Sequence, residues 1–224
     1  MCIRDSAYYH IGHHQEAIKL LEQASGVEPH NASIFSTLGL AYDAVGKPKE
    51  AMAALDKAIE LNPNSANDYY NLGLIHFDQG DNPGAIASME RALELAPDLV
   101  EALRTMARAR MKLGHFREAM PAYAKIAELQ AASEEDYYLL GLAYYSVGDR
   151  AQAATAYRRA LELNPQSAPA HNNLGVVYTE EGQFDSAEKE YHAALEAEPA
   201  FVEAWVNLGR LYGERGMAER AIEA

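Results

Sequence analysis

Apolar and small residues recur along this chain at spacings of three and four, and their order repeats every 34 residues. The clearest markers are the segments IELNP, LELAP, LELNP and LEAEP, which end at Pro63, Pro97, Pro165 and Pro199. Spacings of three and four place side chains on one face of a helix, whereas strict alternation would indicate a strand. The pattern therefore predicts helices throughout, organised as a repeat array with one period.

Each repeat contains two apolar faces separated by a glycine. With the proline set as position 32, positions 4, 7, 8 and 11 line one helix, and positions 20, 24 and 27 line a second. Position 15 is glycine in seven successive repeats, from Gly12 to Gly216, which permits the positive φ that ends a first helix. Small residues at positions 8, 20 and 27 let the two backbones approach closely. Proline at position 32 cannot continue the second helix and closes the repeat.

The period divides the chain without any insertion. We expect one array over residues 7–224, with a partial repeat at 7–31, complete repeats at 32–65, 66–99, 100–133, 134–167 and 168–201, and a partial repeat at 202–224. The opening MCIRDS fits the pattern poorly, so residues 1–6 are expected to be a non-native leader. The final AIEA stops within a helical pattern, so a fragment of a longer chain is expected.

Polar residues and prolines predict where individual helices begin. Asn64 or Ser65, which follow Pro63, and Asp98, directly after Pro97, are residue types that cap the N-terminus of a following helix. Pro48 and Pro83 fall early in second helices, where a missing N–H costs little.

The sixth repeat, with HNNLGVVYTEEGQFDSAEKEYHAALEAEP, carries the pattern well, and the chain resembles the tetratricopeptide repeat family over essentially residues 7–224. The resemblance implies an all-α, right-handed solenoid of antiparallel helix pairs, with first helices lining an inner groove and second helices forming the outer wall. One pair cannot bury its apolar face alone, so stability is expected from stacking. It also implies a non-catalytic scaffold that binds proteins or peptides in the groove.

The charge balance narrows the class of partner. A formal net charge of -14 argues against nucleic-acid binding, which needs a basic face. Only the repeat 100–133 is positively charged on balance. It has three acidic residues and six basic ones, Arg104, Arg108, Arg110, Lys112, Arg117 and Lys125.

In the family, positions 2, 5, 6, 9, 12 and 13 of first helices tend to face the groove. The resemblance thus implies a peptide-binding set made of Tyr70, Asn71, Phe77, Arg104, Arg108, Met111, Lys112, Tyr138, Tyr145, Asn172, Asn173, Asn207 and Arg210. Arginine can grip carboxylates, tyrosine offers flat amphipathic area, and asparagine can bond a peptide backbone, which favours an extended, acidic peptide. An alternative stays open. The arginines can instead pair with neighbouring glutamates, and the tyrosines can pack between helices.

Other chemistry is not indicated by the sequence. No apolar run has the length of a membrane span, and no signal peptide is evident, so the compartment is open with the cytoplasm favoured. Cys2 is the only cysteine, and His10, His13 and His14 fall on both sides of the turn expected at Gly12, so we expect no metal or cofactor. No catalytic constellation stands out.

Two alternative functions remain. The array could be the substrate-recruiting arm of a larger enzyme such as a glycosyltransferase. It could also be a structural or oligomerisation module that stacks on a second copy through its end helix, 202–212, using Leu208 and Leu211.

Overall fold

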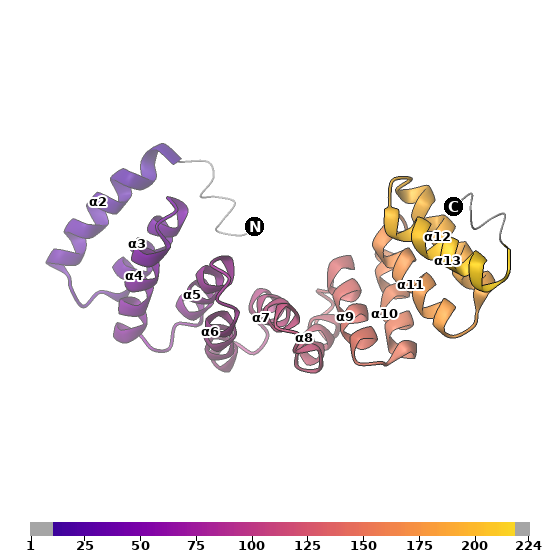
Figure 1. Cartoon of the computed structure of the whole chain (residues 1–224). Coiled ribbons are helices and arrows are strands. Elements are labelled where there is room, and N and C mark those ends of the chain that lie inside the picture. The colour runs from indigo at the N-terminus through magenta and orange to yellow at the C-terminus, as the bar shows by residue number, and fades with distance from the viewer. Residues whose placement is uncertain (1–10, 218–224) are drawn as a thin grey trace. The chain divides into compact units, whose positions relative to one another are not determined.

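The computed structural model describes residues 11–217, and within that range every regular element is a helix. Contacts divide the chain into two compact units, unit 1 (Met1–Gly114) and unit 2 (His115–Ala224). Unit 1 holds α2 (Ile11–Val27), α3 (Ala32–Ala44), α4 (Pro48–Leu61), α5 (Ala66–Asp78), α6 (Asn82–Leu95) and α7 (Val100–Lys112). Unit 2 holds α8 (Phe116–Glu128), α9 (Glu134–Ser146), α10 (Arg150–Leu163), α11 (Ala168–Glu180), α12 (Phe184–Ala197) and α13 (Val202–Glu214) (Figure 1). The expected leader, residues 1–6, lies outside the described residues.

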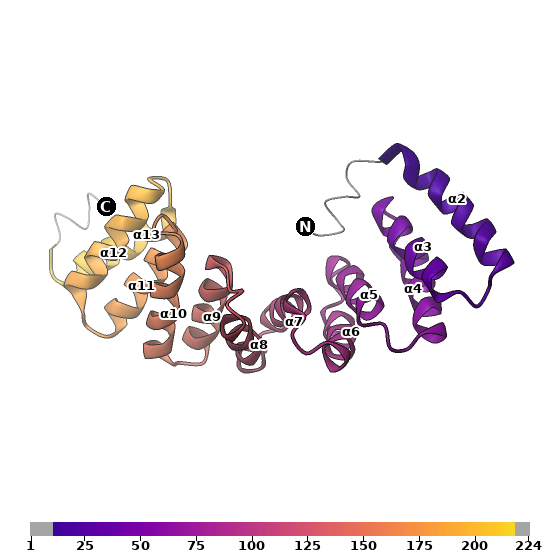
Figure 2. The same ribbon diagram turned by 180° about the vertical axis from the view of Figure 1, so that it is seen from behind.

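Within each unit, helices that follow one another pack as pairs, and each pair contacts the next helix along the chain. In unit 1, α3 packs on α4 and α5 on α6, and the pairs are joined by contacts of α4 with α5. In unit 2, α9 packs on α10 and α11 on α12, with α10 against α11 (Figure 2). The all-α solenoid of helix pairs predicted by the sequence is confirmed.

The helix boundaries follow the sequence period. First helices begin at Ala32, Ala66 and Val100 in unit 1 and at Glu134, Ala168 and Val202 in unit 2. The glycines that follow these helices all have positive φ, as predicted: Gly46, Gly80, Gly114, Gly148, Gly182 and Gly216. Gly12 differs from the prediction, because it lies in the first turn of α2 and not in a turn between helices. The first helix expected before it falls in residues that the structure does not describe.

The helix N-termini confirm one predicted cap and correct another. The Ser65 side chain accepts a hydrogen bond from the Asp68 backbone N–H at the start of α5. At α7 the capping position is Leu99, with no side-chain cap, so Asp98 precedes the cap by one residue and the prediction was wrong. Pro48 and Pro83 lie in the first turns of α4 and α6, as predicted.

Glycine at position 8 allows the helices of a pair to approach closely. A Cβ atom added to Gly141 would lie 2.5 Å from Tyr157 Cε1, and one added to Gly175 would lie 2.7 Å from Tyr191 Cε1. Both tyrosines are fully buried, so each ring rests directly on a glycine backbone. The same relation joins Gly39 to Leu55 and Gly73 to Met89 in unit 1.

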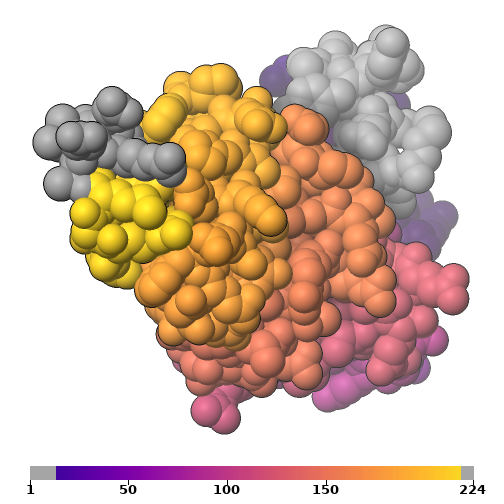
Figure 3. Space-filling model, turned by 90° about the vertical axis from the view of Figure 1, so that its right-hand side faces the viewer, coloured from indigo at the N-terminus to yellow at the C-terminus, as the bar shows by residue number. Residues whose placement is uncertain are grey.

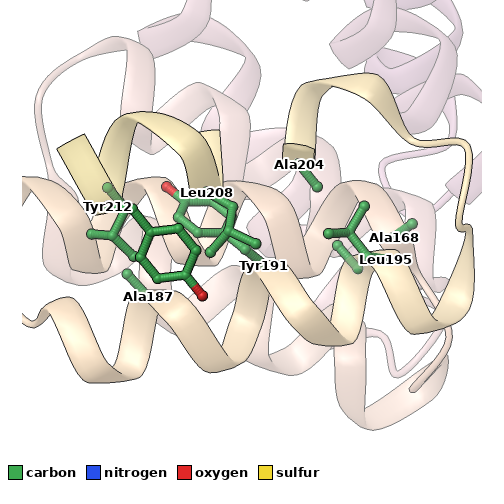
Figure 4. Packing of buried hydrophobic residues seen from close by; sticks show 9 residues of the cluster. Ala168, Ala187, Tyr191, Leu195, Ala204, Leu208 and Tyr212 are labelled. Carbon is green, nitrogen blue, oxygen red and sulfur yellow. The ribbon is translucent and has the colours of Figure 1, made fainter. Parts of the chain in front are cut away.

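Helices α11, α12 and α13 share the core shown in Figure 4. Tyr191 from α12 packs with Leu208, Leu211 and Tyr212 from α13, and Ala168 of α11 joins them. Fully burying a large apolar side chain stabilises the fold by roughly 1.5–3 kcal/mol, so stacking between repeats is a main source of stability here. Leu208 and Leu211 are 1% and 0% exposed. They belong to this core, so the expectation that they form an end surface was wrong.

The fourth repeat is irregular where the sequence is irregular. Helix α8 runs through Pro121 and continues to Glu128. The repeat lacks the proline at position 32, which is Ala131. Gln130, just before it, has a φ of 55°, the only positive value for a non-glycine residue in the described part of the chain. Side chains rarely adopt this conformation, so the exit from α8 is locally strained.

Candidate functional site

A continuous row of hydrogen bonds crosses the first helices of unit 2. Asn207 Nδ2 on α13 donates to Asn172 Oδ1 on α11 at 2.9 Å, and Asn172 Nδ2 donates to Asn173 Oδ1 at 3.2 Å. Asn173 Nδ2 then donates to Tyr138 Oη on α9 at 3.3 Å. We call these four residues the polar row. All four were predicted groove residues, and the structure brings them together. Asn172 is buried, at 6% exposure.

Tyr145, at the C-terminal end of α9, belongs to a second network. Its hydroxyl donates to Glu180 Oε1 on α11 at 2.6 Å. The Arg150 guanidinium lies 4.0 Å from the centre of the Tyr145 ring, forms an ion pair with Glu180, and donates to the Tyr145 carbonyl at 2.6 Å. Burial and the bond to Glu180 both raise the pKa of Tyr145, so the phenol stays neutral at physiological pH. The network fixes the ring against α10.

A small cavity lies between the polar row and this network. Its volume is about 80 Å³, and it is lined by Leu142, Tyr145, Tyr157, Asn173 and Val176. Tyr157 is 0% exposed, and its buried hydroxyl makes no hydrogen bond among the described residues. Burial raises the pKa of Tyr157, as does the nearby Tyr138, and the Asn173 amide beside the hydroxyl opposes this effect. In the structure that amide donates its hydrogen bond to Tyr138.

The predicted residues of unit 1 lie on α5 and α7, whose helices contact each other. Lys112 Nζ lies 4.0 Å from the centre of the Phe77 ring, a cation–π arrangement that joins two of them. Tyr70, Arg104 and Arg108 are partly buried, and each is engaged in interactions within the structure. Asn71 and Met111 are also partly buried, and Lys112 is exposed. The α7 face is therefore basic, with its arginines held by the fold.

Arg110, which sequence analysis placed only in the basic count, binds the preceding repeat. Arg110 Nη2 donates to Glu90 Oε1 on α6 at 2.7 Å. Residues twenty positions apart make the same link elsewhere. Tyr42 Oη donates to Glu22 Oε1 at 2.6 Å, and Tyr212 Oη lies 3.3 Å from His192 Nε2. Glu22 raises the pKa of Tyr42 to about 12, chiefly by accepting this hydrogen bond.

Family models for the tetratricopeptide repeat match residues 6–66 and 36–100, and a further one matches 76–141 and 178–224. A TPR repeat model matches residues 141–180. The chain belongs to the tetratricopeptide repeat family. The resemblance proposed from the repeat pattern is thus confirmed. No curated protein sequence matches the chain.

Several solved tetratricopeptide repeat structures are similar. The crystal structure of a MamA protein is 30% identical, with a TM-score of 0.68, covering 70% of this chain and 86% of its own. YrrB, described as a TPR protein with an unusual peptide-binding site, is 26% identical, with a TM-score of 0.67. The match covers 77% of this chain and 89% of YrrB. A tetratricopeptide repeat protein from Parabacteroides merdae is 22% identical, with a TM-score of 0.71. The match covers 86% of this chain and 76% of that protein, and it shows a likeness of fold.

The repeat pattern did not identify three of the residues that line the cavity. Leu142 and Val176 occupy position 9 of their repeats, which faces the groove in this family, but apolar residues there gave no chemical signal. Tyr157 was assigned to packing because it occupies position 24. The number of hydrogen bonds its hydroxyl makes depends on neighbours from three helices, which the sequence does not reveal. Arg210, a predicted groove residue, is exposed on α13.

No group of three or more His, Cys, Asp or Glu side chains among the described residues is arranged to hold a metal ion. His10 and the side chain of His13 lie outside the described part. None of the described helices has the length and apolar character needed to cross a membrane.

Proposed function

We propose that the chain is a non-catalytic scaffold that binds an extended segment of another protein along its first helices. Membership of the tetratricopeptide repeat family supports this proposal, as does the likeness to YrrB, whose description names a peptide-binding site. The first helices of unit 2 are joined by the polar row, so an extended segment would dock on them with little ordering cost on the scaffold's side.

The polar row carries the proposal. Asn207 and Asn173, which are only partly buried, are oriented by their hydrogen bonds to the buried Asn172 and to Tyr138, so their remaining donors and acceptors are preorganised. An asparagine amide can pair with both the N–H and the C=O of a peptide backbone. Side-chain amides set in a line at the spacing of neighbouring helices suit an extended backbone, whatever its sequence.

The basic face of α7 adds a preference for acidic residues in the partner. Arg104, Arg108 and Lys112 lie on one helix. The chain as a whole carries -14, so an acidic partner is repelled at long range and attracted only near this helix. This part of the proposal predicts binding that weakens as salt screens the contact, since the Debye length is about 8 Å at 0.15 M salt.

A random peptide library displayed on phage and selected on the purified chain tests the proposal. The strongest peptide is then measured by fluorescence anisotropy against Asn207→Ala, which breaks the polar row, and against Asn64→Ala, a matched amide exposed in a loop. We expect a loss of about tenfold for Asn207→Ala and none for Asn64→Ala. Failure to select any peptide, or equal binding by both variants, would contradict the proposed function.

A second candidate function is self-association through α13. Val202 and Val206, four residues apart on α13, are 65% and 64% exposed, and Trp205 between them is 37% exposed. Figure 3 shows α13, in yellow, at the molecular surface. Light scattering over a range of concentrations tests this candidate. A dimer that disappears in Val202→Asp with Val206→Asp supports it, and a monomer at all concentrations excludes it.

A further inference from the structure

Two buried tyrosines at the same position of consecutive repeats differ in one respect. Tyr157 on α10 and Tyr191 on α12 each rest on a position-8 glycine and are each 0% exposed. The Tyr191 hydroxyl lies 3.0 Å from Thr179 Oγ1, so it is hydrogen-bonded. The Tyr157 hydroxyl has no such partner among the described residues. The repeat of α9 and α10 therefore buries a polar group without satisfying it.

The difference arises from one substitution between the repeats. The residue that corresponds to Thr179 is Tyr145, which is too large to fit beside Tyr157 in the same way. Its hydroxyl reaches Glu180 at 2.6 Å, and its ring stacks beneath Arg150. The Tyr145 hydroxyl therefore makes no hydrogen bond to Tyr157 Oη, and both rings line the 80 Å³ cavity.

The lining of the cavity defines what it would accept. Leu142, Val176 and the two tyrosine rings make its walls largely apolar, and the Tyr157 hydroxyl and the Asn173 amide are its polar groups. A water molecule occupies about 30 Å³ in the liquid, so the cavity has room for roughly three heavy atoms. A charged side chain would be desolvated there without an opposite charge, because the Arg150 guanidinium is paired with Glu180.

We propose that this cavity is an anchor pocket for one threonine side chain of the bound segment, with serine as a weaker substitute. The threonine hydroxyl would complete the hydrogen bonding of Tyr157, as Thr179 does for Tyr191 within the chain, and its methyl group would contact Leu142 and Val176. The inference rests on the proposed function, since the pocket borders the polar row through Asn173. It names the one side chain for which the first helices of unit 2 are selective.

The test begins with the best library peptide and a version with each threonine changed in turn to valine, which keeps the shape and removes the hydroxyl. Affinities are measured by fluorescence anisotropy on the wild-type chain, on Tyr157→Phe and on the matched control Tyr191→Phe. We expect one Thr→Val change to weaken binding about tenfold on the wild type and on Tyr191→Phe, and less than twofold on Tyr157→Phe. Circular dichroism melting establishes that each variant is folded.

A second variant tests the volume of the cavity and leaves the Tyr157 hydroxyl in place. Val176→Phe adds a ring to the wall of the cavity and is expected to reduce affinity for the threonine peptide at least tenfold, while leaving the Thr→Val difference below twofold. If peptides bind through the polar row but no selected peptide depends on a threonine, or the Thr→Val effect persists in Tyr157→Phe, the pocket is refuted and the proposed function stands. If no peptide is selected at all, both fall together.

Discussion

Arg110 on α7 donates a hydrogen bond to Glu90 on α6 at 2.7 Å, and so occupies the structural role that a tyrosine has two repeats earlier. Tyr42 makes the equivalent bond to Glu22. The carboxylate accepts a phenol or a guanidinium equally well in this position, because both place a donor at the end of a long, flat side chain. Position 11 of these two repeats therefore makes the same kind of contact with different chemistry.

Replacement of Arg110 tests this equivalence. We expect Arg110→Tyr to change the free energy of unfolding by less than about 0.5 kcal/mol, and Arg110→Ala to lower it by about 1–2 kcal/mol, because alanine removes the bond and the packing of the stem. Glu90 is 51% exposed and regains water, which keeps the loss modest. Urea unfolding followed by circular dichroism measures both. An equal loss in the two variants would show that Glu90 requires a positive charge.

Helix approach at position 8 makes a sharper prediction. In Gly141→Ala the new methyl group meets the buried Tyr157 ring at 2.5 Å, so the helices must separate or the ring must move, at a cost of about 1–3 kcal/mol. Gly213, also helical, has no atom within 4 Å of an added Cβ. Gly213→Ala is expected to stabilise the chain by up to about 1 kcal/mol. Thermal melts of the two variants should therefore shift in opposite directions.

The paired tyrosines give a stability prediction that needs no ligand. Tyr157→Phe removes a buried hydroxyl that lacks a hydrogen bond, so the free energy of unfolding should rise by about 1 kcal/mol. Tyr191→Phe removes a hydrogen-bonded hydroxyl and leaves Thr179 without that partner. The free energy of unfolding should therefore fall by about 1 kcal/mol. Chemical denaturation of the two variants side by side decides the matter. A loss in Tyr157→Phe would mean that its hydroxyl is satisfied in solution.

His171 links stability to pH. Its Nδ1 lies 2.6 Å from Glu190 Oε2 and its Nε2 lies 3.1 Å from the Pro165 carbonyl, two acceptors that favour the doubly protonated ring. The bond to Glu190 raises the pKa of His171 above its ordinary value, and burial opposes it. A raised folded pKa means that this stabilisation is complete below the unfolded value, about 6.5, and is lost as pH rises through the folded value.

Unfolding midpoints measured between pH 5.5 and 8.5 should thus fall more steeply in the wild type than in His171→Gln. His115, which is half exposed with Glu118 3.6 Å away, provides a control. His115→Gln should leave the pH profile unchanged. A wild-type profile that His171→Gln reproduces would contradict the assignment.

Charge reversal on α7 tests the preference for acidic partners. The double variant Arg104→Glu with Arg108→Glu is expected to reduce the affinity for an acidic peptide at least tenfold at low salt without unfolding the chain. Arg158→Glu with Arg159→Glu makes the same change in net charge on the exposed face of a second helix, α10, and should have less than a threefold effect. Binding is measured by anisotropy at two salt concentrations. Equal losses in the two double variants would place the effect in net charge alone.

The extent to which the sequence predicted the site differs between the two units. In unit 2, Tyr138, Asn172, Asn173 and Asn207 were grouped by their repeat positions, and they do contact one another. In unit 1, the arginines of α7 were placed on a basic face, but the sequence left open which groups engage them. The difference is physical. Repeat position determines which helix face a residue occupies, whereas long charged side chains select among several partners within reach.

The sequence by itself determined the helices, the turns between them and the close approach at the glycines. These features depend on local backbone preferences and on one period repeated along the chain, so each is encoded within a few residues. Only the tertiary structure decided which hydroxyls and amides are satisfied. Tyr145 bonds Glu180, thirty-five residues away, and that choice leaves Tyr157 beside a cavity. Hydrogen bonds between side chains depend on rotamers and on distances of a few tenths of an ångström, which only the packed helices define.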